Sequence, residues 1–286
     1  MGTEKQTRRH FLWTVSTATA TSFGGTTVSL GQSQSSGPLA EAKSRLKLGL
    51  ASYTLRKFSL DDALAMMARL ELKYVALKSF HLPLDSTEAE CEAVAAKVKQ
   101  AGLRLYGAGV ISMKSEEQVH QAFDYAKAAG MNVIIGAPQP ELLPLIDKKV
   151  QQYDIELAIH NHGPGDKNYP TPAVAYKRIK DLDKRIGLCN DIGHTMRAGV
   201  DPSVSAERFA DRLLDVHMKD VSAATAKGGA VEVGRGVIDI PKFIKTLLKI
   251  GYEGVVAFEY EKDADDPFVG LAESVGYVRG VLAAVS

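Results

Sequence analysis

Cysteine is scarce in this sequence, whose 286 residues include only Cys91 and Cys189. The two cysteines lie in separate apolar segments, so they lack the close spacing of a metal-binding knuckle or a redox pair. A small scaffold held together by disulfides is therefore excluded, and we expect two buried thiols.

An excess of charge of one sign is also missing. The sequence has 35 Lys and Arg against 34 Asp and Glu, a formal net charge of +1. Such a balance gives no electrostatic field that would attract nucleic acid or an anionic membrane. The expected partner is a small molecule, and the sequence leaves open whether the chain forms a homo-oligomer.

The only tryptophan, Trp13, lies in an N-terminal segment that differs from the rest of the chain. Arg8 and Arg9 precede a mildly apolar stretch rich in Thr, Ala and Ser, and a polar run follows at 32–38. This order predicts a twin-arginine export signal with a flexible linker over residues 1–40, and a periplasmic or extracellular location; a basic, unstructured tail is the alternative. We expect no membrane span after processing, and any ligand stacking would then use Tyr, Phe or His.

From residue 45 to 286 the sequence alternates short apolar runs with longer amphipathic ones, which is typical of βα units. Ser59, Ser115 and Asp201 are predicted to begin helices, and Gly102 and Gly130 to end them. The eight predicted strands cover 46–51, 74–78, 103–108, 132–136, 156–160, 186–191, 213–217 and 255–259. A glycine-rich phosphate or dinucleotide loop is missing after the first of them, so the pattern predicts one α/β domain over 45–286, a (β/α)8 TIM barrel. The segment 221–236, rich in Gly and Ala, is predicted to be a loop at the site.

The strands of such a barrel carry its site at their carboxyl ends, and here four of them end on His or carboxylate residues. In three of these four strands a small residue lies two positions before the terminal polar residue and on the same strand face. These small residues are Ala158, Cys189 and Ala257, and they leave space beneath a bound ion. Asp215, two before the end of the seventh strand, breaks this rule without an account from the sequence. The four predicted metal ligands are His160, Asp191, His217 and Glu259.

Two imidazoles and two carboxylates form a mixed ligand set that suits a borderline divalent ion. We predict Mn²⁺ first, with Co²⁺, Zn²⁺, Fe²⁺ or Mg²⁺ as alternatives. Such an ion polarises a carbonyl or hydroxyl group and stabilises an enediolate, which is chemistry that sugars undergo. Any one of these residues alone is more often structural, a hydrogen-bonded His or a helix-capping carboxylate; their repetition at successive strand ends favours a shared site.

Further polar residues lie next to these four positions in the sequence. We predict catalytic roles for Glu259, His162 and Lys78. The predicted contacts to a sugar or glycoside substrate are His81, His194, Lys219, Asp220 and Arg235.

The segments 157–163, 190–194, 217–220, 234–236 and 258–260 resemble the xylose isomerase-like TIM barrel superfamily, which includes sugar phosphate isomerases/epimerases, ketose 3-epimerases and inosose dehydratases. The resemblance runs from Leu46 to the C-terminus. It implies that Asp191, His217 and Glu259 are metal ligands and that His194 contacts substrate. Isomerases of that group end the fifth strand on a second catalytic Glu, where this chain has His160.

The substitution at His160 keeps two enzyme hypotheses open. The first is a metal-dependent sugar isomerase or epimerase, in which a group other than His160 supplies the second proton-transfer role. The second is a lyase or dehydratase that acts on keto-sugars or 3-keto-glycosides by β-elimination. A non-catalytic sugar-binding barrel is a third reading. An endonuclease on abasic DNA is disfavoured, because the chain shows neither a basic groove nor additional zinc ligands.

Overall fold

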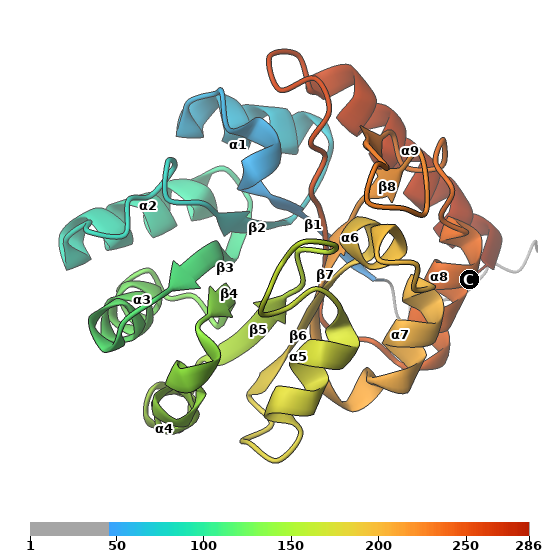
Figure 1. Ribbon diagram of the computed structural model, residues 1–286. Coiled ribbons are helices and arrows are strands. Elements are labelled where there is room, and N and C mark those ends of the chain that lie inside the picture. Colours follow the sequence, from blue (N-terminus) through green and yellow to red (C-terminus); the bar gives the residue numbers. More distant parts are fainter. Residues whose placement is uncertain (1–45, 286) are drawn as a thin grey trace, which may run out of the picture. The chain divides into compact units, whose positions relative to one another are not determined.

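The computed structural model describes residues 46–285, and within them the chain forms a closed barrel of eight parallel strands. Around the barrel the strands follow the order β1-β10-β7-β6-β5-β4-β3-β2, so each neighbours the one before and after it in this series (Figure 1). The strands are β1 (Lys47–Ala51), β2 (Tyr74–Leu77), β3 (Arg104–Met113), β4 (Val133–Pro138), β5 (Glu156–His160), β6 (Ile186–Asp191), β7 (Leu213–Met218) and β10 (Val255–Phe258). The predicted (β/α)8 fold is confirmed.

Helices follow the strands and surround them (Figure 1). The α-helices are α1 (Leu60–Arg69), α2 (Glu88–Gln100), α3 (Glu116–Ala128), α4 (Leu143–Tyr153), α5 (Pro172–Ile179), α6 (Ile192–Arg197), α7 (Pro202–Arg208), α8 (Ile240–Lys249) and α9 (Phe268–Val285). Short 3-10 turns are η2 (Ser52–Leu55), η3 (Pro140–Leu142) and η4 (Ala210–Arg212). The predicted export signal and linker, residues 1–40, lie outside the described residues.

The predicted helix boundaries are confirmed by their capping contacts. Ser59, Ser115 and Asp201 each accept a backbone N–H in the first turn of α1, α3 and α7 with their side chains. Gly102 and Gly130 follow α2 and α3 with φ of 76° and 65°, a left-handed backbone that glycine adopts without strain. After β6 the chain forms two short helices, α6 and α7, rather than one.

Small side chains fill the interior of the barrel below the carboxyl ends of the strands. Ala76, Ala158, Cys189 and Ala257 belong to one buried cluster, as the alternation along the strands predicts. Both cysteines are free and buried, so the expected thiols are confirmed. A separate and larger apolar core lies mainly between the strands and the helices.

The segment after β7 is more structured than the sequence predicts. It contains a two-stranded antiparallel hairpin, β8 (Asp220–Val221) with β9 (Ala230–Val231). The prediction of an unstructured site loop is therefore wrong in part. The segment still reaches the neighbourhood of the site, because Arg197 donates to the carbonyl of Ala226 and also contacts the His194 ring.

Of the described helices, α9 is long and apolar enough to cross a membrane by length and composition alone. In this fold it closes the ring of outer helices beside α8. Leu271, Val275 and Val278 are buried, and Arg279 donates to the carbonyl of Leu70.

Candidate metal and sugar site

Four side chains at the ends of β5, β6, β7 and β10 meet in one buried cluster. One potential ligand atom from each lies within 4.8 Å of all the others. The Nε2 atom of His160 lies 3.1 Å from Nδ1 of His217, 3.4 Å from Oδ2 of Asp191 and 3.9 Å from Oε2 of Glu259. The Nδ1 atom of His217 lies 3.2 Å from Oε2 of Glu259.

These separations match the space around a small divalent ion. Ligand atoms about 2.1 Å from a tetrahedral ion are about 3.4 Å from one another. Asp191 Oδ1 accepts the backbone N–H of His194 at 2.7 Å and caps α6, while the buried Oδ2 faces the cluster, 3.4 Å from His160 Nε2. One carboxylate therefore begins a helix with one oxygen and turns the other toward the cluster, so the residues present fit an ion.

Electrostatics keep both carboxylates of the cluster ionised. Burial favours the neutral acids, but His194 and Lys219 hold the pKa of Asp191 well below its usual range. The pKa of Glu259 is likewise lowered, because Lys219 and His217 outweigh its burial. Burial lowers the pKa of His160 to about 3, so this imidazole is neutral and able to bind a metal.

Lys219 lies among these carboxylates. Its ammonium is 2.9 Å from Asp191 Oδ2, 2.9 Å from Glu259 Oε2 and 3.1 Å from Glu261 Oε1, and its side chain is only 3% exposed. The pKa of Lys219 is raised well above its usual value, since these three carboxylates outweigh its burial. A Cβ atom at Gly193 would lie 2.8 Å from the Lys219 chain, so glycine makes room for the lysine there.

A cavity of about 230 Å³ opens above the cluster. Three predicted proton-transfer residues line it, Glu259, His162 and Lys78, together with the predicted substrate contact His194. Burial lowers the pKa values of Lys78 and His162, against smaller opposing effects of Glu259 and Asp166 respectively. The lowered pKa makes the neutral amine of Lys78 available closer to neutral pH, and it keeps the His162 imidazole neutral, so that either group can accept a proton.

Two predicted substrate contacts, Asp220 and Arg235, have partners outside the cavity. The Asp220 carboxylate is fully buried and accepts four backbone N–H groups, those of Val221, Gly234, Gly236 and Ile238. Arg235 forms a paired hydrogen bond with the carboxylate of Glu273 on α9, and its side chain is 63% exposed. The Asp220 side chain therefore accepts hydrogen bonds from the backbone of its own loop, and the Arg235 side chain pairs with α9, so neither points into the cavity.

Two further predicted contacts, His81 and Lys219, do not line the cavity. His81 is buried, and its Nε2 lies 3.1 Å from the carbonyl oxygen of Phe58. Lys219 lies below the cavity floor, among the carboxylates. The residues that the sequence analysis missed are Tyr53, Val110 and Glu261, which line the cavity, and Asp166, whose Oδ2 lies 3.4 Å from His162 Nδ1. Glu261 had a signal, because it stands two residues after Glu259 and thus on the same side of an extended chain.

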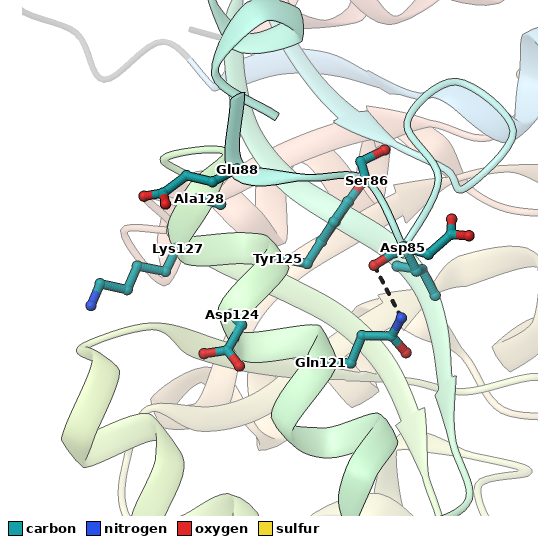
Figure 2. A pocket seen from close by; sticks show the side chains of 9 residues that line it. Asp85, Ser86, Glu88, Gln121, Asp124, Tyr125, Lys127 and Ala128 are labelled. Carbon is teal, nitrogen blue, oxygen red and sulfur yellow. Dashed lines mark hydrogen bonds between the residues drawn. The ribbon is translucent and has the colours of Figure 1, made fainter. Parts of the chain in front are cut away.

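A second cavity, of about 520 Å³, lies on the outer surface between the start of α2 and helix α3 (Figure 2). Its lining includes Asp85, Glu88 and Asp124, and Gln121 donates to the carbonyl of Leu84 there. The lining includes neither the four candidate ligands nor any of the predicted site residues. The smaller cavity above the histidines is therefore the better candidate for chemistry.

The fold is a TIM barrel, and the cluster of His, Asp and Glu side chains at the carboxyl ends of its strands could hold a metal ion. The chain belongs to the xylose isomerase-like TIM barrel family, whose model matches residues 52–280. The predicted resemblance is confirmed at the level of the family.

Individual relatives are distant. The rhizopine catabolism protein MocC of Rhizobium meliloti is 28% identical over 131 residues, 41% of this chain and 40% of that protein. Inosose dehydratase of Lacticaseibacillus casei is 24% identical over 199 residues, 54% of this chain and 66% of that protein. The chain thus spans less than two thirds of either relative. A solved L-ribulose 3-epimerase shares the fold, with a TM-score of 0.69 and 16% identity over 84% of this chain and 96% of that one.

Proposed function

We propose that this protein is a divalent-metal-dependent enzyme that isomerises or epimerises a sugar by moving a proton next to the sugar's carbonyl group. One observation carries the proposal: the four candidate ligands lie at the base of a cavity that two further bases, Lys78 and His162, line from different strands. An ion held by His160, Asp191, His217 and Glu259 would polarise the carbonyl oxygen of a bound sugar. Mn²⁺ is the ion that we favour for this mixed ligand set.

Epimerisation needs a base on one face of the reacting carbon and an acid on the other. Lys78 follows β2 and His162 follows β5, and β3 and β4 separate these strands in the closed barrel. The two side chains therefore approach the cavity from well-separated directions. This arrangement supplies the second proton-transfer group that His160 cannot supply while it binds a metal.

Each of the two bases is held by a partner. The Lys78 ammonium donates to the carbonyl of Val110, and Asp166 Oδ2 lies 3.4 Å from His162 Nδ1. Asp166 is itself fixed, since its Oδ1 accepts the backbone N–H groups of Asn168 and Tyr169. His162 can then take up a proton on Nε2 while Asp166 stabilises the imidazolium.

Glu259 suits a ligand better than a base. Its lowered pKa makes its carboxylate a weaker base than an ordinary glutamate. Removal of a proton next to a carbonyl leaves negative charge on the substrate oxygen, and the Lys219 ammonium lies 2.9 Å from Glu259 beneath the cavity, where it stabilises such charge.

A lyase or dehydratase is the second candidate. Two observations favour it: the carboxylate that isomerases of this family carry on the fifth strand is His160 here, and the sequence relatives include an inosose dehydratase. In that reaction the same proton is removed, and loss of a β-leaving group takes the place of returning a proton to carbon. His162 or Lys78 would then protonate the leaving group.

Proton NMR in D₂O separates the two reactions. The metal-loaded protein is incubated with neutral ketoses, hexoses, their 3-keto forms and keto-glycosides, and the sugars are analysed after the protein and ion are removed. An isomerase or epimerase places solvent deuterium on a carbon of an intact sugar, whereas a lyase releases a smaller product. Purified protein that holds less than about 0.2 equivalents of divalent metal and transforms none of these sugars would refute both.

Variants then test the residues. His162→Gln and Lys78→Met should each lower turnover by about 100-fold or more, the usual contribution of a general acid or base. His120→Gln is the matched control, because His120 is exposed on α3, away from the cavity. Full turnover in both cavity variants would remove these residues from the mechanism.

A further inference from the structure

Asp215 is a fully buried carboxylate inside the barrel, and the proposed reaction gives it no role. It lies on β7, two residues before His217, where three other strands carry Ala158, Cys189 and Ala257. A buried carboxylate is costly unless polar neighbours compensate for the lost water. The contacts of Asp215 with its polar neighbours therefore indicate its role.

Two neutral donors from other strands fix Asp215. The hydroxyl of Tyr106 on β3 donates to Oδ2 at 2.9 Å, and the thiol of Cys189 on β6 donates to Oδ1 at 3.3 Å. The carboxylate is thus anchored from two sides, and Oδ1 also faces its own strand neighbour, His217.

The two ring nitrogens of His217 face different neighbours. Nδ1 faces the cluster, 3.1 Å from His160 Nε2 and 3.2 Å from Glu259 Oε2. Nε2 is buried without a hydrogen-bond partner and lies 3.7 Å from Asp215 Oδ1. A neutral imidazole that binds a cation through Nδ1 must carry its proton on Nε2, and a carboxylate on that side favours this tautomer.

We propose that Asp215, anchored by Tyr106 and Cys189, is a positioning residue that holds His217 with Nδ1 toward the cluster and thereby strengthens the binding of a divalent ion. The inference rests on the proposed function, because it assumes that the cluster binds a metal. Asp215 touches neither the cavity nor the other three ligands, so it acts through His217. It also accounts for the one strand on which a carboxylate replaces the small residue.

The test measures ion binding rather than turnover. The full-length chain, stripped of metal, is titrated calorimetrically with Mn²⁺ and with Co²⁺, and the visible spectrum of the Co²⁺ form reports the geometry of its ligands. Asp215→Asn, which keeps the size of the side chain, should weaken both ions by about 10- to 100-fold and shift the Co²⁺ spectrum. Tyr106→Phe, which removes one anchor only, should weaken them by about threefold or more.

Glu232→Gln is the matched control. Glu232 is also buried and also accepts a tyrosine hydroxyl, that of Tyr260, at 2.9 Å, but it does not contact any of the four candidate ligands. It should bind both ions as tightly as the parent chain. Thermal unfolding of the metal-free variants, followed separately, shows any purely structural effect of each substitution.

The ion affinities and the Co²⁺ spectrum test whether Asp215 acts through His217. Equal affinity and an unchanged Co²⁺ spectrum in Asp215→Asn would overturn the inference, even if that variant unfolds at a lower temperature. If Asp215→Asn does not fold, unchanged affinity in Tyr106→Phe overturns it instead. A parent chain that binds neither ion overturns the proposed function and the inference together, whereas tight binding without any turnover overturns the proposed function alone.

Discussion

At the scale of single residues, His160 distinguishes this chain from the isomerases that it resembles. The imidazole replaces a carboxylate at the end of β5, and its neutral Nε2 still lies within 3.9 Å of the other three ligand atoms. An imidazole at this position gives the cluster one negative charge fewer than a carboxylate would. Under the proposed function, this changes which ions bind well and which group moves the second proton.

The residue at this position should tolerate a carboxylate. We expect His160→Glu to keep divalent-metal binding, with affinity for Mn²⁺ within about tenfold of the parent, and to shift preference from Co²⁺ toward Mn²⁺ because oxygen ligands favour the harder ion. Competition between the two ions, followed by metal analysis of the purified protein, measures the shift. Loss of binding would contradict the position assigned to His160.

Lys219 is predicted to have opposite effects on binding and on turnover. Its ammonium lies 2.9 Å from one oxygen of Asp191 and one of Glu259, so it repels an ion held by the same two carboxylates. Lys219→Met should raise Mn²⁺ affinity by about tenfold or more and lower kcat, because charge on the substrate oxygen loses its stabiliser. Calorimetry and steady-state kinetics measure the two effects. Weaker ion binding in this variant would contradict the assigned role.

At the scale of elements, the segment between β7 and α8 is organised by a single carboxylate. Asp220 begins β8, two residues after the end of β7, and accepts N–H groups from both ends of the hairpin segment. Gly236 permits this, because a Cβ atom there would lie 2.1 Å from Asp220 Oδ1. Asp220, which the sequence predicts to contact the substrate, therefore anchors this loop through its backbone N–H groups.

The anchor can be tested separately from the site. Asp220→Ala leaves four backbone N–H groups without an acceptor and should destabilise the fold by about 2 kcal/mol or more. We expect faster cleavage between residues 221 and 238 in limited proteolysis, with the Mn²⁺ affinity unchanged. Gly236→Ala should reproduce the effect through its clash with the same carboxylate. Intact proteolytic resistance in both variants would refute the anchor.

At the scale of the whole molecule, the barrel and the N-terminal segment pose separate questions. The barrel brings side chains from β2 to β10 to one edge, so its site depends on complete closure of the sheet. The N-terminal residues 1–40 carry the predicted twin-arginine signal, and we propose that the chain is exported to the periplasm or beyond.

Export is expected to depend on the arginine pair. In a bacterium with a twin-arginine pathway, the full chain should appear outside the cytoplasm, and the double substitution Arg8→Lys with Arg9→Lys should retain it inside. Fractionation followed by immunoblotting measures the distribution. Substitution of Lys5 by Gln is the control. An unchanged distribution in the arginine variant would refute the signal.

The sequence by itself determined the barrel and its central cluster. Alternation predicted the strands within a few residues of their observed ends; β3 departs most, because it continues to Met113. The positions of His160, Asp191, His217 and Glu259 followed from the same pattern, since parallel strands in a closed barrel bring their carboxyl ends to one edge. The small residues beneath them followed from the two-residue period of a strand.

Only the tertiary structure decided what the side chains beyond the strand ends do. Asp220 and Arg235 occupy the same stretch of sequence as the site, yet their partners come from the hairpin segment and from Glu273 on α9. Lys219 and Glu261 follow the neighbouring strands β7 and β10 and form an ion pair there. Asp215 accepts a hydrogen bond from Tyr106, which lies on the opposite side of the barrel. A strand has a fixed period that local sequence records, whereas a side chain after its end pairs with whatever the folded chain brings within hydrogen-bond distance.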